Sequence, residues 1–481
     1  MTRSRLARVR IPAPLVALLA VAAVSGVAWA LLLPPLQGPD ESGHVAYVQK
    51  LVEARELPWH STPPPAAAHR PSVSTEADTA LGWGEIEAMR GNLTGRAPAS
   101  EVEVRRWQQH ASGLTHHDRA DGGYASVFAY PPLYYVYAAV PYAVTYPTSF
   151  FDRELAMRLA NVPLLLMVVV LTWLLAGELF ERRRWLQAMA AGAVALNPQA
   201  VHLSAVVDPD PLLALQWSGF LYLAVLMLKR GPTTRRVAGI AALTLASCLT
   251  HPRGLALLPV AAIAVLLAVV RHRGVPRRLR APLVGAIAAV GALAVVAAAD
   301  YGARGLQPSH LRGLVSYVWQ FYLPRLPFMT PSVRSDWTVR DAFVDRFWTF
   351  AQFDVSFSRG VLDALAVLMA AMLVSAIVAL VLRRSAIRSA PDVLVLFVVT
   401  VVVYLVSAHL AAYRGLVRDP TDPVITGRYL VPLIAVFGVT VALSLSWLPR
   451  RLAGPACGIV LGGMALLQVG ALGSVVERFY A

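Results

Sequence analysis

Long apolar segments, separated by short clusters of arginine, follow one another along almost the whole chain. The first runs from Ile11 to Leu33, which is long enough to cross a hydrocarbon layer of about 30 Å as a helix. The 481 residues are 57% hydrophobic and only 15% charged, whereas soluble proteins carry about 25% charged residues. Helices satisfy their own backbone hydrogen bonds inside lipid, so the pattern predicts an all-α polytopic membrane protein.

The positive charge of the chain is concentrated at the ends of these segments. A formal net charge of +15 is compatible with nucleic-acid binding, but the arginines fall between apolar segments, as the positive-inside rule expects. We therefore expect no nucleic-acid partner and place the clusters in the cytoplasm. These clusters are 3–10, 182–184, 229–236, 271–280, 383–388 and 450–451.

This assignment predicts about 11 crossings with a cytoplasmic N-terminus and an external C-terminus. The predicted crossings are 11–33, 157–180, 186–206, 211–228, 237–250, 254–270, 281–299, 360–382, 391–411, 427–447 and 453–474. The stretch 130–144 is rich in tyrosine and is interpreted as a helix lying in the outer interface, while a twelfth crossing at 130–149 stays open.

The chain then divides into five parts, of which two are long external loops expected to carry interfacial helices. The parts are the N-terminus with its first crossing (1–33), the first external loop (34–150), a transmembrane bundle (151–300), the second external loop (301–359) and the C-terminal crossings (360–481).

An acidic motif follows directly after the first crossing. Pro39 suits the first turn of a helix, and the helix dipole favours the carboxylates of Asp40 and Glu41 there. His44 lies one turn after Asp40 on the same face. A carboxylate held at the membrane boundary can act as a general base, and we predict Asp40 for this role with Glu41 as the reserve. The alternative interpretation is a solvated acidic helix start.

The predicted topology brings further polar residues to the same outer face. Such clustering predicts one external site, although helix ends collect polar residues in any membrane protein. The arginines suit a phosphate group, or they extend to lipid headgroups instead. Gly427 is expected to let a ligand approach the backbone, and Gly458 with Gly462 to pack against another helix. The predicted substrate-binding residues are His44, Arg158, Asn161, Asp208, Asp210, His251, Arg253, Arg414, Arg418, Arg428 and Tyr429.

Five short motifs, in this order, resemble those of GT-C-type membrane glycosyltransferases. The closest resemblance is to a bacterial branch of predicted membrane proteins, the DUF2142 type. The motifs are Pro39-Asp40-Glu41, Tyr130-Pro131-Pro132-Leu133-Tyr134-Tyr135, Arg158-Leu159-Ala160-Asn161, Asn197-Pro198 with Asp208, and Gly427-Arg428-Tyr429-Leu430-Val431-Pro432.

The resemblance implies a GT-C-like helical bundle in the bacterial plasma membrane, with its active site on the outer face. It implies a polyprenyl-phosphate sugar donor, an envelope glycan, lipid or protein acceptor, and inversion in one displacement with Asp40 as base. The second acid corresponds to Asp208 or Asp210, which holds a divalent cation in some relatives and no metal in others. The alternatives are a flippase for lipid-linked sugars and a non-catalytic envelope-assembly protein.

Overall fold

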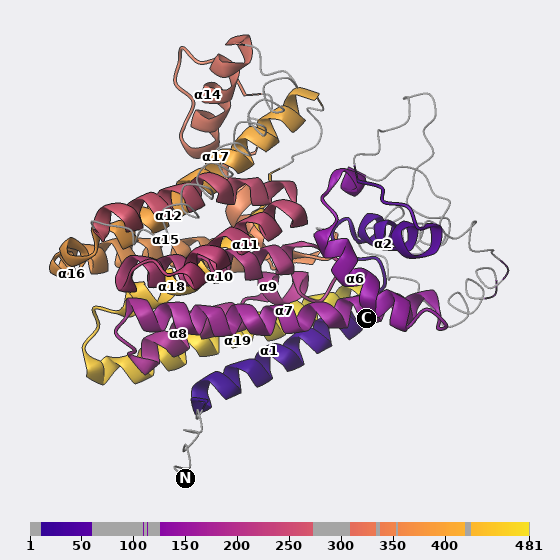
Figure 1. The fold of residues 1–481 in the computed structure, drawn as a ribbon, viewed down its shortest axis with the longest axis horizontal. Coiled ribbons are helices and arrows are strands. Elements are labelled where there is room, and N and C mark those ends of the chain that lie inside the picture. Colours follow the sequence, from indigo (N-terminus) through magenta and orange to yellow (C-terminus); the bar gives the residue numbers. More distant parts are fainter. Residues whose placement is uncertain are drawn as a thin grey trace.

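Helices dominate the computed structural model, which describes residues 11–59, 109, 113, 126–272, 308–332, 337–352, 355–418 and 425–480 (Figure 1). Within these residues, 8 helical segments are long and apolar enough to cross a membrane. They are Ala13–Leu32, Phe150–Leu179, Asp210–Arg230, Pro252–Arg271, Arg359–Leu382, Pro391–Val417, Gly427–Leu445 and Arg451–Tyr480. The predicted class, an all-α polytopic membrane protein, is confirmed.

The α-helices are α1 (Ala13–Leu32), α2 (Glu41–Gln49), α6 (Leu133–Val144), α7 (Phe150–Leu179), α8 (Arg184–Ala195), α9 (Pro198–Leu203), α10 (Asp210–Arg230), α11 (Thr234–Thr250), α12 (Leu257–Arg271), α14 (Pro308–Tyr322), α15 (Arg359–Leu382), α16 (Arg384–Ser389), α17 (Pro391–Arg418), α18 (Ile434–Leu445) and α19 (Arg450–Tyr480). Shorter helical turns are η1 (Lys50–Ala54), η3 (Ser126–Ala129), η4 (Pro252–Ala256), η5 (Arg340–Val344), η6 (Asp345–Trp348) and η7 (Gly427–Leu433). Strands β1 (Thr349–Phe350) and β2 (Val355–Ser356) form one antiparallel pair in the second loop.

Each predicted crossing coincides with a helix or a helix pair, except 281–299, which lies outside the described residues. The number of crossings therefore stays a prediction. The helix α6 has 12 residues, or about 18 Å at 1.5 Å per residue. That length is short of the hydrocarbon thickness, in agreement with an interfacial position rather than a twelfth crossing.

Several helix ends differ from the prediction; α19, for example, continues to Tyr480 instead of ending at 474. The helix α7 begins at Phe150 instead of 157, because Ser149 and Asp152 form a capping box that satisfies its first N–H groups. The helix α17 continues to Arg418 instead of ending at 411, because Ala412 and Leu416 continue its apolar face against α14. Arg414 and Arg418 therefore lie on a helix and not in the short loop expected for them.

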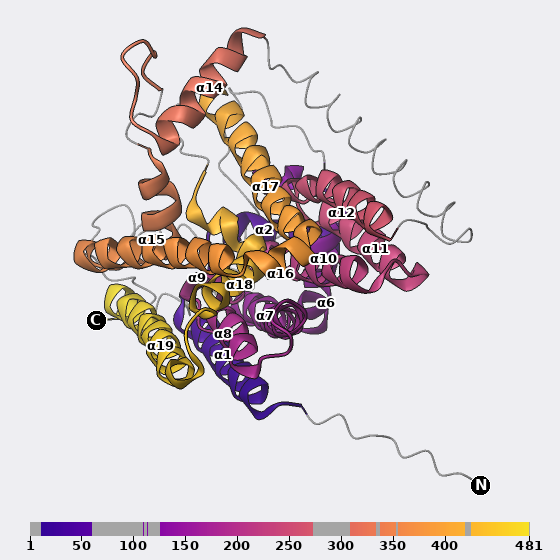
Figure 2. The ribbon, with the colours of Figure 1, turned by 90° about the vertical axis from the view of Figure 1, so that its left-hand side faces the viewer.

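Helix α7 is the central element of the bundle. It packs against α1, α8 and α10, while α18 packs against α8 and α15 (Figure 2). The core between these helices is filled by large apolar side chains such as Trp217 and Phe220. Gly458 and Gly462 contribute nothing to this packing. No described atom lies within 4 Å of a Cβ added to either glycine, contrary to the expected helix contact.

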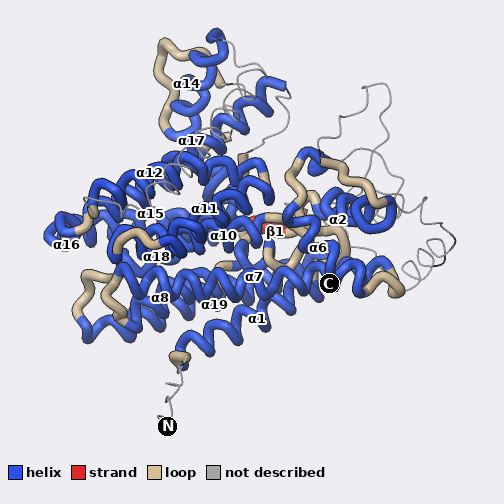
Figure 3. Tube along the Cα trace, in the orientation of Figure 1, coloured by secondary structure: helices blue, strands red, loops and turns tan. Residues whose placement is uncertain are grey.

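Proline marks the boundaries between successive helices at one end of the bundle. Pro198 separates α8 from α9, and Pro252 separates α11 from α12, because proline lacks an N–H and clashes with the preceding turn. Most connections between helices gather at the two ends (Figure 3). The connections that carry Asp40, Asp208, His251 and Arg428 come together at the end where α2 and α6 lie.

Candidate functional site

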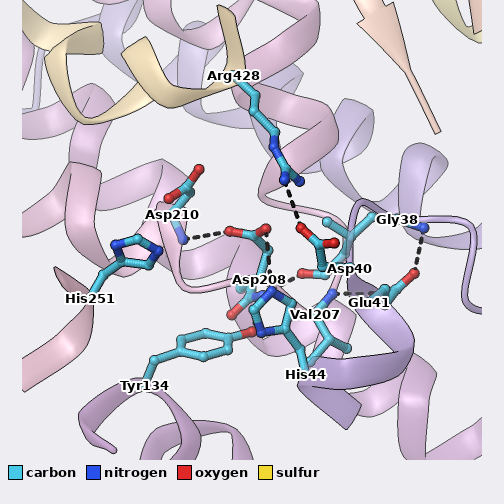
Figure 4. Close-up of polar contacts among 12 residues, drawn as sticks. Gly38, Asp40, Glu41, His44, Tyr134, Val207, Asp208, Asp210, His251 and Arg428 are labelled. Carbon is cyan, nitrogen blue, oxygen red and sulfur yellow. Dashed lines mark hydrogen bonds and ion pairs between the residues drawn. The ribbon is translucent and has the colours of Figure 1, made fainter. Parts of the chain in front are cut away.

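Asp40 stands at the centre of this group of connections (Figure 4). It precedes α2 with φ 54° and ψ 15°, a left-handed conformation that is uncommon for residues other than glycine and most accessible to Asn and Asp. Its carboxylate accepts a hydrogen bond of 2.6 Å from Nη2 of Arg428, and 48% of its side chain remains exposed. Asp40 is therefore held in place by one guanidinium while keeping access to solvent.

Glu41, the next residue, has the opposite environment. It is fully buried and accepts N–H bonds from Gly38 (2.7 Å) and Val207 (2.8 Å). Arg158 donates to both of its oxygens, at 2.8 and 2.6 Å. A Cβ on Gly38 would lie 2.7 Å from this carboxylate, so only glycine fits there. Glu41 thus joins three segments of the chain and has no oxygen left for a substrate.

Arg158 is the hub of this buried network. Besides Glu41 it pairs with Glu154 at 3.0 Å, and it donates to the backbone carbonyls of Leu33 (2.7 Å) and Pro34 (2.9 Å). Its side chain is 3% exposed. Arg158 therefore ties α7 to the end of α1 and to the acidic motif, and its donors are occupied within the protein.

Asp208 lies beside Asp40 in the connection between α9 and α10 (Figure 4). Its Oδ1 accepts the N–H of Asp210 at 2.7 Å, and its Oδ2 lies 3.8 Å from Nε2 of His44. The other ring nitrogen of His44 is 2.9 Å from the hydroxyl of Tyr135. Asp208, His44 and Tyr135 thus form a buried row next to the exposed carboxylate of Asp40.

Two arginines and one tyrosine form the other wall of the site. Arg253 pairs with Asp210 at 2.5 Å and stacks on the ring of Tyr429 at 4.5 Å. Arg428 lies 5.3 Å from the centre of the same ring. His251 accepts the N–H of Arg253 at 3.0 Å, and its ring lies 4.4 Å from that of Tyr130. Tyr429 therefore lies against two guanidinium groups, of which that of Arg428 is also bonded to Asp40.

Three of the predicted residues lie apart from this central group. Asn161 is fully buried, and its amide N–H groups donate to the hydroxyl of Tyr134 (2.9 Å) and to the carbonyl of Val206 (2.6 Å). It therefore fixes the segment that leads to Asp208. Arg414 lies on the part of α17 that packs against α14. The side chain of Arg418 is outside the described residues.

Burial and nearby charges shift the pKa values of Asp40, His44 and Asp208 in different directions. Burial raises the pKa of the Asp40 carboxyl, but the Arg428 guanidinium outweighs this effect and keeps that pKa below its ordinary value. Burial lowers the pKa of His44 to about 3, and burial together with the charge of Asp210 raises the pKa of Asp208 well above its usual range. At neutral pH the site therefore holds an ionised Asp40 beside a neutral His44, while Asp208 binds a proton more readily than an exposed aspartate does.

The residues do not fit the divalent cation considered from the sequence. Asp40 and Asp210 are paired with arginines, and one oxygen of Asp208 accepts a backbone N–H. Among the described residues, no three His, Cys, Asp or Glu side chains converge as metal ligands. The guanidinium groups of Arg428 and Arg253, bonded to Asp40 and Asp210, place positive charge at these carboxylates, which disfavours a bound cation there.

Sequence reasoning missed four side chains that shape the site. Glu154 shares Arg158 with Glu41 and accepts the N–H of Leu36 at 2.8 Å. Tyr130, Tyr134 and Tyr135 contact His251, Asn161 and His44 respectively. The three tyrosines belong to a motif already used for the family resemblance, and this motif was the available signal: Tyr130 precedes α6, and Tyr134 and Tyr135 lie in its first turn.

Fold and site together define a multi-pass, all-helical membrane protein with a single group of acidic, basic and aromatic side chains at one end of the described bundle. The chain belongs to the DUF2142 family of predicted membrane proteins, whose model matches residues 24–437. The resemblance to this family seen in the sequence is therefore confirmed. A comparison with curated proteins gave no match.

The structure is also similar to solved structures of two other proteins. The oligosaccharyltransferase AglB from Archaeoglobus fulgidus, in complex with an inhibitory peptide and a dolichol-phosphate, is 13% identical with a TM-score of 0.49 over 97% of this chain and 56% of its own. ArnT from Cupriavidus metallidurans, bound to undecaprenyl phosphate, is 15% identical with a TM-score of 0.45 over 96% of this chain and 74% of its own. The present chain thus spans little more than half of the archaeal enzyme. At these TM-scores the similarities define neither a substrate nor a site for this chain.

Proposed function

We propose that the protein is an inverting glycosyltransferase that uses a polyprenyl-phosphate sugar at the outer face of the bacterial plasma membrane, with Asp40 as general base. The observation that carries this proposal is the contrast between adjacent carboxylates. Glu41 is buried and fully bonded, whereas Asp40 is half exposed and held by one arginine. Only Asp40 can meet an acceptor hydroxyl.

The wall formed by Arg253, Arg428 and Tyr429 supports the binding of a lipid phosphate. Arginine forks match phosphate oxygens, and one of these guanidiniums is bonded to Asp40 before any ligand binds. A phosphate that binds Arg428 competes with Asp40 for the same donor. The exchange frees the carboxylate and raises its pKa from the lowered value, which makes Asp40 a stronger base once the donor is bound.

The reaction then balances as a single displacement. The acceptor oxygen bonds to the anomeric carbon, the bond from that carbon to the phosphate oxygen breaks, and the acceptor proton moves to Asp40. Polyprenyl phosphate leaves with its charge facing the arginines. Such a base contributes roughly 10²–10⁴-fold to the rate. The envelope glycan, lipid or protein that supplies the hydroxyl is the proposed acceptor.

The test is transfer by the purified protein in detergent, with a panel of synthetic polyprenyl-phosphate sugars and envelope lipids as acceptors. Mass spectrometry measures the glycosylated acceptor and the released polyprenyl phosphate. We expect Asp40→Asn to lower the rate by about 10² or more, while Asp363→Asn, an exposed carboxylate on α15, keeps the normal rate.

Equal rates for Asp40→Asn and the unchanged protein would remove Asp40 from the proposed mechanism. Transfer in detergent needs no second compartment, so it also separates an enzyme from the flippase considered as an alternative. A protein that moves labelled donor across vesicles but never transfers the sugar would favour the flippase.

A further inference from the structure

Helix α9 and its surroundings contain buried polar atoms that no described protein group bonds. Trp29, Asn197, Gln199 and His202 are each 0% exposed. The atoms without a hydrogen-bond partner are Nε1 of Trp29, Nδ2 of Asn197, both amide atoms of Gln199 and both ring nitrogens of His202. Buried polar groups are nearly always bonded in folded proteins, so this group calls for a bonding partner.

These side chains are neighbours in the bundle. The ring of His202 lies 5.0 Å from that of Trp29 on α1 and 5.8 Å from that of Phe350 on β1. Gln199 and His202 are three residues apart and share one face of α9. Helix α19 also contacts α9 and carries Gln468, which is 3% exposed and has two unbonded amide atoms.

The same place is a break in the predicted crossing 186–206. The helix α8 ends before Asn197, whose Oδ1 bonds the N–H of Ala200 at 3.0 Å and starts α9 anew. Non-helical backbone at membrane depth is tolerated where it is buried in protein or lines a water-filled cavity. The chain break and the unbonded side chains are independent observations that lead to one conclusion.

We propose that Trp29, Gln199 and His202 line an internal hydrated site whose bound water molecules bridge these side chains. The indole and amide N–H groups donate, while the amide oxygen and one imidazole nitrogen accept, and water can serve both kinds of group. A bound cation fits poorly, because the set holds no carboxylate. Helix α9 leads into the connection that carries Asp208 and contacts η7, which carries Arg428. The waters would therefore lie next to the segments that carry Asp208 and Arg428. The inference does not depend on the proposed reaction.

Radiolytic hydroxyl labelling of the intact protein in detergent tests this site, because radicals formed from a bound water modify the side chains beside it. Trp217 is the matched control. It is also 0% exposed, but its indole N–H is donated to Ser247 at 3.1 Å. We expect Trp29 and His202 to be oxidised several-fold faster than Trp217. Equal, slow oxidation of all three would show a dry site and overturn the proposal.

A variant locates the water. His202→Phe keeps an aromatic ring between Trp29 and Phe350 and removes both nitrogens, and with Gln199→Leu it removes most of the polar atoms. In the folded double variant, oxidation of Trp29 should fall to the rate of Trp217, and an unchanged rate at Trp29 would contradict the assignment. If the double variant does not fold, the ratio between Trp29 and Trp217 in the unchanged protein decides alone.

Discussion

At the scale of single residues, the acidic motif shows how neighbouring carboxylates acquire different roles. The left-handed backbone at Asp40 turns the chain so that its side chain and that of Glu41 face different surroundings. Glu41 is held by two backbone N–H groups and Arg158, whereas Asp40 faces solvent and Arg428. Glu41, whose carboxylate accepts four hydrogen bonds, stabilises the fold. Asp40, whose carboxylate is exposed, can contact a substrate.

Glu41→Gln and Asp40→Asn should therefore have opposite consequences. Replacing Glu41 leaves Arg158 buried with Glu154 as its remaining acidic partner, and breaking a buried ion pair costs about 3–5 kcal/mol. We expect Glu41→Gln to lower the thermal unfolding temperature in detergent strongly, and Asp40→Asn, at a half-exposed carboxylate, to lower it much less while reducing transfer. An unaltered unfolding temperature for Glu41→Gln would return Glu41 to the candidates for the base.

His44 should make the protein sensitive to acid. The pKa of His44 is about 3 in the folded protein, against 6.5 for an exposed histidine. Below pH 6.5, therefore, His44 binds a proton in the unfolded chain but not in the folded protein. Stability is complete above this pH and is lost as the pH falls toward 3, by about 2 kcal/mol at pH 5 from this residue.

The comparison of unchanged protein with His44→Gln isolates this effect from other groups. Unfolding temperatures measured from pH 7 to pH 4.5 should fall less steeply for His44→Gln. The groups near His44 are the same in both proteins; they are Asp40, Asp208, Arg253, Arg428, His251, Tyr130 and Tyr135. Parallel curves would mean that His44 takes up a proton in the folded protein without cost.

At the scale of elements, the apolar pattern predicts the crossings but not their ends. The residues of the capping box, Ser149 and Asp152, are present in the sequence, but they lie around the end of the predicted first external loop (34–150), and the helix was predicted to begin only at 157. The break between α8 and α9 was also marked, by Pro198 within the predicted crossing 186–206. When hydropathy alone is used to define a membrane crossing, caps and prolines that mark helix ends within it are overlooked.

The turn η7 depends on a close contact that the sequence suggested for another reason. Gly427 was expected to admit a ligand, but a Cβ there would lie 2.6 Å from the backbone N and Cα of Phe347. We expect Gly427→Ala to displace η7, to destabilise the protein by about 1–3 kcal/mol and to reduce transfer by moving Arg428.

Gly462→Ala on α19 is the matched substitution, since no described atom lies within 4 Å of its added Cβ. Alanine favours a helix over glycine by about 1 kcal/mol, so this variant should be as stable as the unchanged protein or more so. Thermal unfolding of both variants in the same detergent checks the pair. Similar stability for the two would show that η7 can move away from Phe347 without cost.

At the scale of the whole molecule, the sequence is sufficient for the class of fold and for the end of the bundle at which polar residues gather. It does not predict which side chains form hydrogen bonds or ion pairs with one another. Arg158 was predicted to bind substrate, yet it is 2% exposed and bonds Glu41, 117 residues away in the chain. Such a pairing follows from the packing of α1 against α7, because a buried guanidinium must find its acceptors within the protein.

The membrane orientation of the bundle gives the last prediction. The ends of helices that carry Arg182–Arg184, Arg271 and Arg383–Arg384 lie opposite to the end that carries Asp40 and Arg428. The positive-inside rule places arginine-rich ends in the cytoplasm, and it therefore predicts that the candidate site faces outward. After replacement of Cys248 and Cys457, single cysteines at Ser100 and Ser332 should react with an impermeant thiol reagent in intact cells, whereas one at Ser385 should react only after the cells are opened. Labelling of Ser385→Cys in intact cells, with protection of the other two, would reverse the orientation and place the site in the cytoplasm. Polyprenyl-phosphate sugars facing outward would then be excluded as donors, whatever the chemistry of Asp40.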